Sequence, residues 1–121
     1  LNPIDEHLTL QCRPAQISQV ITNLLNNAID AVVGSANPWV SIDVKVVEGQ
    51  VLIMITDSGP RISEELQQKI FQAFFTTKAA GKGTGLGLSI SAQIMKDHSG
   101  AIEIDSKCET TRFVLRFPKK A

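Results

Sequence analysis

The sequence is poor in cysteine and histidine, and its charges cancel. Two cysteines and two histidines among 121 residues leave too few ligands for an obvious zinc site, and Cys12 and Cys108 form no C-x-x-C pair. We therefore expect both cysteines to be small apolar residues of a protein in a reducing compartment. The 12 basic and 12 acidic residues give no net charge, whereas proteins that bind duplex nucleic acid usually carry a basic excess. Nucleic acid is thus not expected as a partner.

Long hydrophobic runs are also missing. No apolar stretch approaches the roughly 18 residues that cross a bilayer as a helix. The length of 121 residues fits one compact domain, so we expect residues 1–121 to form a single domain. Because the sequence begins at Leu1 and not at methionine, we interpret it as a piece of a longer protein. We expect this piece to be cytoplasmic and without direct membrane contact, although the full-length protein could be anchored in the inner membrane.

Helices and strands are predicted from the spacing of the apolar residues. Amphipathic helices are expected at residues 15–33 and 85–98, and Ser63 should cap a short helix that runs to about residue 71. Strands are expected at residues 8–12, 39–47, 50–56, 101–106 and 111–117, and Glu48-Gly49 should form a hairpin turn between two of them. Residues 72–84 lack periodicity and predict a long, functional loop. Five strands and three helices in this order predict an α+β, two-layer sandwich.

The first helix carries an unusual polar face. Asn23, Asn27 and Asp30 lie at positions i, i+4 and i+7, with Asn26 beside them, so they project from one side of a helix that is otherwise strongly apolar. One interpretation is a solvated outer face. The other is an oxygen-ligand site for a hard cation such as Mg²⁺, which binds carbonyl oxygens, water and nucleotide phosphates.

A carboxylate follows the strand expected at residues 50–56. Asp57-Ser58-Gly59 is a common turn sequence, and a plain turn is one interpretation. Alternatively, Asp57 accepts a hydrogen bond from the exocyclic amine of adenine, while Gly59 permits close approach. Such a bond would discriminate adenine from guanine, which offers an oxygen at that position.

Three glycines at alternate positions open the helix expected at residues 85–98. They lie in the segment GTGLGL at residues 83–88. This segment could turn backbone amides toward a ligand, and a helix N-terminus presents unpaired N–H groups and partial positive charge to phosphate. It matches neither GxxxxGK[ST], because Lys82 is followed by Gly83, nor GxGxxG, because Leu86 and Leu88 stand where the last glycine is needed. A merely flexible loop is the alternative.

Together these segments resemble the GHKL, or Bergerat, ATP-binding domain that gyrase, Hsp90, histidine kinases and MutL share. Four motifs carry the resemblance in the family's order: an N box (QVITNLLNNAIDA, residues 19–31), a G1 box (residues 57–62), an F box (IFQAFFTTK, residues 70–78) and a G2 box (GTGLGLSI, residues 83–90). The resemblance covers about residues 8–117. It implies a mixed five-stranded sheet packed by three helices, with residues 72–84 as a lid over ATP.

The resemblance also implies roles for individual residues. Asn27 resembles the family's Mg²⁺ ligand, and Asn23 its partner on the phosphate side. Asp57 resembles the aspartate that reads adenine, Gly59 the glycine that lets the base approach, and Thr111 a threonine in the water network around adenine.

Further cofactor-binding residues follow from the same motifs. The backbone of the G2 box would hold the phosphates, and lid lysines could meet the γ-phosphate, so that one of them joins Asn23 and Asn27 as a catalytic residue. The phosphate-binding residues expected are Gly83, Thr84, Gly85, Leu86, Gly87 and Leu88; the lysines are Lys78, the catalytic one, and Lys82; and Asp30 and Ile62 complete the nucleotide-binding set.

One position favours a particular branch of the family. Members that hydrolyse ATP carry a glutamate as general base four residues before the metal-binding asparagine, and here that position is Asn23, which cannot take a proton. The FFTTK and GTGLGLSI segments also resemble histidine kinases. The implied function is the ATP-binding catalytic domain of a two-component sensor histidine kinase, which donates the γ-phosphate to a histidine on a separate dimerisation domain and serves a response regulator. Neither His7 nor His98 is expected to be that histidine, so the chain should bind Mg²⁺–ATP without phosphorylating itself.

Two departures from the family pattern leave alternatives open. Arg61 replaces the second glycine of the G1 box, which would cost about 1 kcal/mol or more if that position needs positive φ, or would add a cation near the nucleotide. Residues 107–110 (KCET) stand where a third glycine motif is expected. The alternatives are a degenerate, non-catalytic interaction module with weak nucleotide binding, and an anti-sigma-factor serine kinase, which usually has the glutamate that Asn23 replaces.

Overall fold

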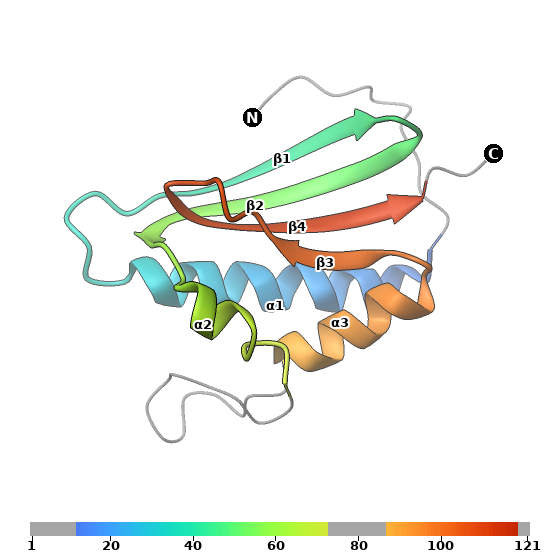
Figure 1. Cartoon of the computed structure of the whole chain (residues 1–121), viewed down its shortest axis with the longest axis horizontal. Helices are drawn as coiled ribbons and strands as arrows, with labels where there is room; N and C mark the ends of the chain where they lie inside the picture. The colour runs from blue at the N-terminus through green and yellow to red at the C-terminus, as the bar shows by residue number, and fades with distance from the viewer. Residues whose placement is uncertain (1–11, 73–86, 119–121) are drawn as a thin grey trace.

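The computed structural model describes residues 12–72 and 87–118, which form a sheet with helices on one of its sides (Figure 1). The helices are α1 (Pro14–Val32), α2 (Glu64–Gln67) and α3 (Gly87–Asp97). The strands are β1 (Val40–Val47), β2 (Gln50–Pro60), β3 (Ala101–Ile104) and β4 (Thr110–Pro118). The predicted two-layer α+β architecture is confirmed.

The described strands are arranged in the order β1-β2-β4-β3, and each neighbouring pair is antiparallel. β1 and β2 form the predicted hairpin, in which Glu48 and Gly49 have φ angles of 49° and 78°. Positive φ at both central residues matches the right-handed twist of the flanking strands. The strand predicted at residues 8–12 lies outside the described residues except for Cys12, so the described sheet has four strands where five were expected, and none of its pairs is parallel.

Two predicted boundaries differ from the structure. β2 does not end at residue 56 but continues to Pro60, so the residues interpreted as a turn are strand. Asp57 pairs with Thr111 of β4, and the amide of Ser58 donates to the carbonyl of Trp39 at 3.0 Å. These long-range partners override the local turn preference. α2 is shorter than predicted, a single turn in which the Ser63 hydroxyl accepts from the amide of Leu66 at 3.2 Å.

The core lies between the helices and the inner face of the sheet. α1 buries the apolar stripe that predicted it: Ile17, Val20, Leu24, Ala28 and Val32. All of these except Val32 join Ile94 and Met95 of α3 and a set of strand residues: Val51, Ile55, Phe113, Leu115 and Phe117. Burying a side chain of this size stabilises a fold by about 1.5–3 kcal/mol. The packing of α3 on α1 and the sheet fixes the position of Gly87, the G2-box glycine at which α3 begins.

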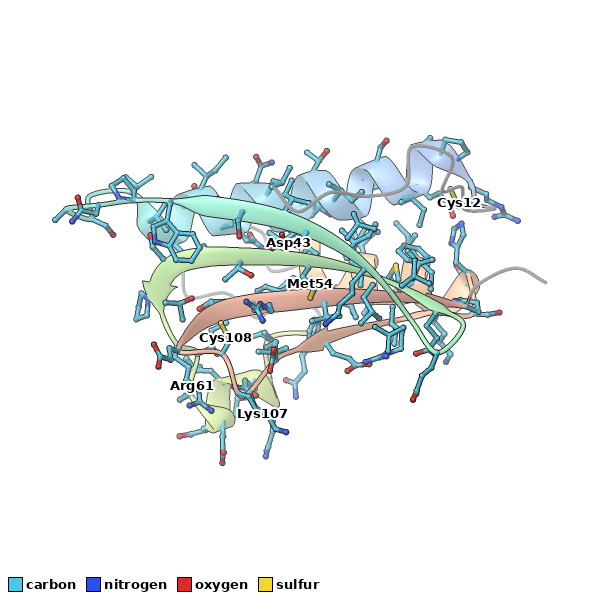
Figure 2. All side chains as sticks on the ribbon, turned by 90° about the horizontal axis from the view of Figure 1, so that it is seen from above. Cys12, Asp43, Met54, Arg61, Lys107 and Cys108 are labelled. Carbon is cyan, nitrogen blue, oxygen red and sulfur yellow. The ribbon has the colours of Figure 1, made fainter. Side chains whose placement is uncertain are left out.

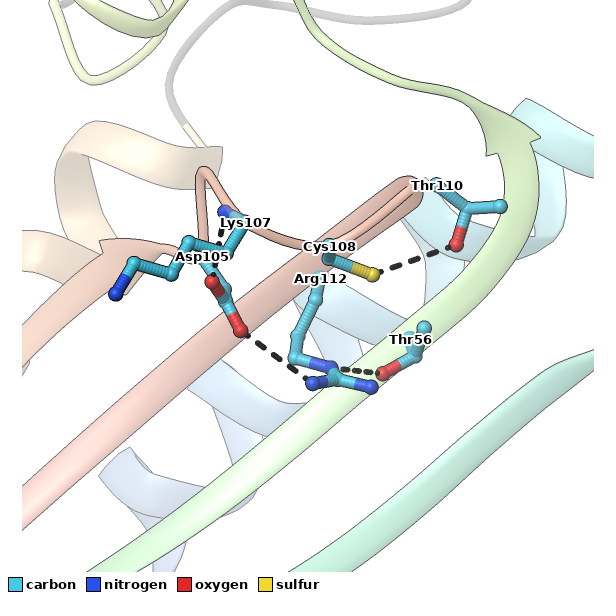
Figure 3. Close-up of polar contacts among 6 residues, drawn as sticks. All are labelled: Thr56, Asp105, Lys107, Cys108, Thr110 and Arg112. Atoms are coloured by element: carbon cyan, nitrogen blue, oxygen red, sulfur yellow. Dashed lines mark hydrogen bonds and ion pairs between the residues drawn. The ribbon is translucent and has the colours of Figure 1, made fainter.

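The outer face of the sheet is held by two arginines of β4. Arg116 donates from Nε to Glu103 at 2.9 Å and from Nη1 to Gln50 at 2.8 Å, so it links β3, β4 and β2. Arg112 donates to the hydroxyl of Thr56 at 2.8 Å and to Asp105 at 3.3 Å (Figure 3). The described helices α1, α2 and α3 lie on the opposite side of the sheet (Figure 1). Side-chain hydrogen bonds therefore connect neighbouring strands on the face of the sheet that the described helices do not cover.

The turn between β3 and β4 closes without glycine. Asp105 accepts from the amide of Lys107 at 2.9 Å through its side chain and from the amide of Cys108 at 3.2 Å through its backbone carbonyl. The thiol of Cys108 lies 3.6 Å from the hydroxyl of Thr110 (Figure 3). Asp105 thus supplies the hydrogen bonds of a tight turn where the family pattern would have glycines.

Candidate functional site

Asp57 is the most deeply buried carboxylate among the described residues. It lies near the end of β2, on the strand face toward the helices, with 2% of its surface exposed. Its Oδ1 accepts a hydrogen bond from the amide of Gly59 at 2.7 Å. Burial raises the pKa of the Asp57 carboxyl above its ordinary value of 3.8, and the bond from Gly59 partly opposes that rise. A carboxylate held at this cost in a packed site is a candidate for ligand recognition.

Gly59 allows this arrangement because it has no side chain. A Cβ atom at this position would lie 2.7 Å from Oδ1 of Asp57 and 3.2 Å from the carbonyl oxygen of Ala31 in α1. Both distances are below normal van der Waals contact, so a larger residue would displace either the carboxylate or the helix. The strand end that carries Asp57 therefore lies directly against α1.

Thr111 lies opposite Asp57 across the β2–β4 pair. It is 5% exposed, and its hydroxyl donates to the carbonyl oxygen of Pro60 at 2.8 Å. The pairing register shifts between Asp57 and Pro60, so the regular pairing of β2 with β4 is interrupted beside this hydrogen bond. The structure therefore brings together two residues that the family resemblance assigned to the adenine side, although they lie far apart in the sequence.

Asn23 joins α1 to the beginning of α3. Its Nδ2 donates to the carbonyl oxygen of Gly87 at 3.4 Å and to the hydroxyl of Ser91 at 3.3 Å. A Cβ atom on Gly87 would lie 3.8 Å from Cγ of Asn23, an ordinary contact. The N box and the G2 box therefore meet at the helix N-terminus. Leu88, next in the G2 box, packs against the core.

The polar residues of α1 differ in exposure, so some fit a cation site and others fit a solvated outer face. Asn27 is half-buried like Asn23, whereas Asn26 and Asp30 are exposed. Ile62, two residues after the end of β2, is half-buried and packs against the core. The described residues contain no group of three His, Cys, Asp or Glu side chains that could hold a metal ion. Of the four polar residues on this face of α1, the half-buried ones are thus the amides Asn23 and Asn27.

Several predicted residues lie outside the described part of the chain. They are Lys78, Lys82, Gly83, Thr84, Gly85 and Leu86, together with all of the predicted lid except Gln72.

Arg61 does not strain the backbone. Among the described non-glycine residues, positive φ occurs only at Glu48 and Ser99, so the expected cost of an arginine at a glycine position is not incurred. The guanidinium of Arg61 donates to the carbonyl oxygen of Ser106 in the β3–β4 turn. Figure 2 shows Arg61 and Lys107 at the same end of the molecule. Arg61 therefore braces the turn that leads into β4.

His98 connects the ends of two helices. Its Nδ1 donates to the carbonyl oxygen of Ile94 at 2.8 Å, and its Nε2 accepts from the amide of Arg13 at 3.0 Å. Because both ring nitrogens have backbone partners, this histidine ties the end of α3 to the beginning of α1. Sequence reasoning missed this link, as it missed Ser91, whose only signal was a polar residue on the buried stripe of an amphipathic helix.

A model of the family described as "Histidine kinase-, DNA gyrase B-, and HSP90-like ATPase" matches residues 12–121. The chain belongs to this family. It is 37% identical over 121 aligned residues to the two-component sensor PprA of Pseudomonas aeruginosa, covering 96% of the chain and 13% of that protein. It is 36% identical to the sensor histidine kinase ZraS of Escherichia coli O157:H7, covering 90% of the chain and 23% of that protein. The chain thus spans less than a quarter of either relative.

Solved structures agree with this family membership. The catalytic domain of the histidine kinase ThkA in a nucleotide-free form is similar with a TM-score of 0.82 and 38% identity, covering 97% of this chain and 76% of that one. ThkA in complex with the response regulator TrrA is similar with a TM-score of 0.77 and 34% identity, covering 96% of this chain and 32% of the other. This histidine-kinase-like chain has no helix, within its described residues, that is long and apolar enough to cross a membrane.

Proposed function

We propose that residues 1–121 are one catalytic domain that binds Mg²⁺–ATP and, within a full-length sensor kinase, passes the γ-phosphate to a histidine on a separate dimerisation domain. A single observation carries the proposal: α1 connects both ends of the site. Ala31 lies against Gly59 beside the buried Asp57, and Asn23 contacts Gly87 at the N-terminus of α3. Ala31 comes eight positions after Asn23, which is about 12 Å along the helix. An extended nucleotide can lie along such a helix, with its base at one end and its phosphates at the other.

The residues present fit the two ends of ATP. Asp57 would accept from the adenine amine, with Thr111 and Ile62 beside the base. The N-terminus of α3, with Gly87 and Leu88, would face the phosphates, since unpaired helix N–H groups favour anions. The motifs alone assign further residues to the same phosphates, because these residues lie outside the described part of the chain. They are residues 83–86 and the lid lysines Lys78 and Lys82.

The amides of α1 fit a magnesium ion. Mg²⁺ binds through a few protein oxygens while it keeps waters and phosphate oxygens as its other ligands. Asn27 would supply such an oxygen, with Asn23 one turn earlier and the exposed Asp30 further along the same helix. When bound, the ion would neutralise phosphate charge, which is much of what phosphoryl transfer requires.

The composition of the site favours transfer over hydrolysis. Asn23 stands where a general base would be needed to activate water, and an amide cannot take the proton. The domain would then supply positioning and charge neutralisation, while the nucleophile comes from another domain. The structure of the histidine kinase ThkA has been solved in complex with a response regulator. By similarity, we expect a response regulator to receive the phosphoryl group from the full-length protein. We expect this transfer to take place in the cytoplasm.

Labelling of the full-length protein with γ-labelled ATP tests this proposal. We expect an acid-labile, base-stable phosphohistidine that forms only with Mg²⁺ and disappears in an Asn27→Ala variant. Label on serine would instead support the serine-kinase alternative. Absence of both label and nucleotide binding would support a degenerate interaction module.

A further inference from the structure

Ser91 is a fully buried polar residue that no motif explains. It lies on the apolar face of α3 with Ile94 and Met95, at 0% exposure. A buried hydroxyl is unfavourable unless it is hydrogen-bonded. The partner of Ser91 is Nδ2 of Asn23, 3.3 Å from the hydroxyl oxygen. A small polar site is thus built into the α1–α3 interface beside the candidate phosphate end.

A second acceptor fixes the orientation of the Asn23 side chain. The carbonyl oxygen of Gly87 lies 3.4 Å from the same Nδ2 and can only accept hydrogen bonds. The amide nitrogen of Asn23, and not its oxygen, must therefore face α3. Because the amide group is planar, Oδ1 points away from the two acceptors. α3 thereby selects which end of Asn23 is directed away from the helix interface.

We infer that Ser91 is a positioning residue that, together with the Gly87 carbonyl, directs Oδ1 of Asn23 toward the Mg²⁺ site, where this oxygen coordinates the ion or accepts a hydrogen bond from its bound water. In the reversed orientation Asn23 would present N–H groups, which suit phosphate oxygens but repel a cation. The inference rests on the proposed function, because it assigns a direction to one amide of the same site. It also gives a role to a hydroxyl that lies in an otherwise apolar stripe.

Removal of the Ser91 hydroxyl should weaken the effect of Mg²⁺ on nucleotide binding. In Ser91→Ala, only the longer contact to Gly87 still orients Asn23, so the amide can rotate. The quantity to measure is the ratio of affinities for a non-hydrolysable ATP analogue with Mg²⁺ and with EDTA, by calorimetry. We expect the ratio to fall about three- to tenfold, the effect of one neutral hydrogen bond. Ser18→Ala, which removes an exposed hydroxyl from α1, should leave the ratio unchanged.

A double-mutant cycle separates positioning from a general packing effect. If Ser91 acts through Asn23, adding Ser91→Ala to Asn23→Ala should not lower the ratio further. Ser91→Cys, with a similar side-chain volume and a weaker acceptor, should give an intermediate ratio, and it serves as the test if thermal unfolding shows that the alanine variant is not folded.

Each outcome has a distinct meaning. An unchanged ratio in Ser91→Ala, beside a lowered ratio in Asn23→Ala, would overturn the inference and leave the proposed function standing. Equal losses from Ser91→Ala with and without Asn23 would overturn it as well, because Ser91 would then act independently. If the unsubstituted protein binds no nucleotide with or without Mg²⁺, the proposed function itself fails.

Discussion

Replacing Asp57 by asparagine should change which base the domain accepts. The Asp57 side chain uses Oδ1 to accept from the Gly59 amide at 2.7 Å. An asparagine that keeps this bond must place its NH₂ group on the other arm of the side chain. That group donates where the carboxylate accepted, so it opposes the adenine amine and suits the oxygen that guanine carries at the same position.

The size of the effect follows from the type of bond that is lost. A hydrogen bond to a charged group contributes about 1.5–3 kcal/mol, so Asp57→Asn should weaken ATP binding by roughly 10- to 150-fold. Affinity for GTP should fall less or rise. The fold should persist, because a neutral amide of the same shape replaces a carboxylate whose burial is unfavourable.

Competition binding of ATP and GTP analogues to the two proteins measures this preference. Asp97→Asn is the matched control, since it removes the same charge from an exposed carboxylate that accepts from Gln93. It should retain the preference for ATP. If Asp57→Asn binds ATP over GTP as strongly as the unsubstituted protein does, Asp57 does not read the base, and the assignment of this end of the site to adenine is wrong.

Three further predictions concern the same strand end. The raised pKa of Asp57 means that the folded state binds the proton of this carboxyl more tightly than the unfolded state does. The contribution of Asp57 to the free energy of unfolding is therefore greatest below pH 3.8 and declines as pH rises through the folded pKa. Chemical unfolding across this pH range should show the decline in the unsubstituted protein and not in Asp57→Asn. Gly59→Ala should destabilise the fold by about 1–3 kcal/mol, because its Cβ would lie 2.7 Å from Oδ1 of Asp57, and an unchanged unfolding midpoint would contradict the close approach. Arg61→Gly should lower the free energy of unfolding by about 0.5–2 kcal/mol through loss of the bond to Ser106 and added chain entropy, whereas a gain in stability would mean that the arginine is a defect.

The long helix was predictable because its signal is local. Apolar residues at helical spacing, with Pro14 at the start and Gly34 after the end, predicted residues 15–33, and the structure has Pro14–Val32. The hairpin at Glu48-Gly49 was equally local. The end of β2 was not, since the turn preference of Asp57-Ser58-Gly59 yields only when Trp39 and Thr111 supply partners from distant parts of the chain.

The residues of the candidate site also differ in whether a local sequence signal indicated them. Motif spacing indicated Asn23 and Asp57, because the chemistry of a nucleotide site requires an amide face and a buried acceptor. Sequence alone could not indicate what orients them. The contact of Ser91 with Asn23 spans 68 positions, and that of Arg61 with Ser106 spans 45, so both depend on how the elements pack. The sequence likewise left open whether the position of Arg61 needs positive φ, since a backbone φ depends on the surrounding fold, and the structure shows that it does not.

The most direct test of the account is calorimetric titration of this chain with a non-hydrolysable ATP analogue, with and without Mg²⁺. We expect saturable binding of the analogue, with an affinity that Mg²⁺ raises. In Asn27→Ala, Mg²⁺ should no longer raise this affinity. Absence of binding at millimolar nucleotide, or binding that is the same in EDTA and in Asn27→Ala, would contradict the claim that α1 and the N-terminus of α3 form a Mg²⁺–ATP site.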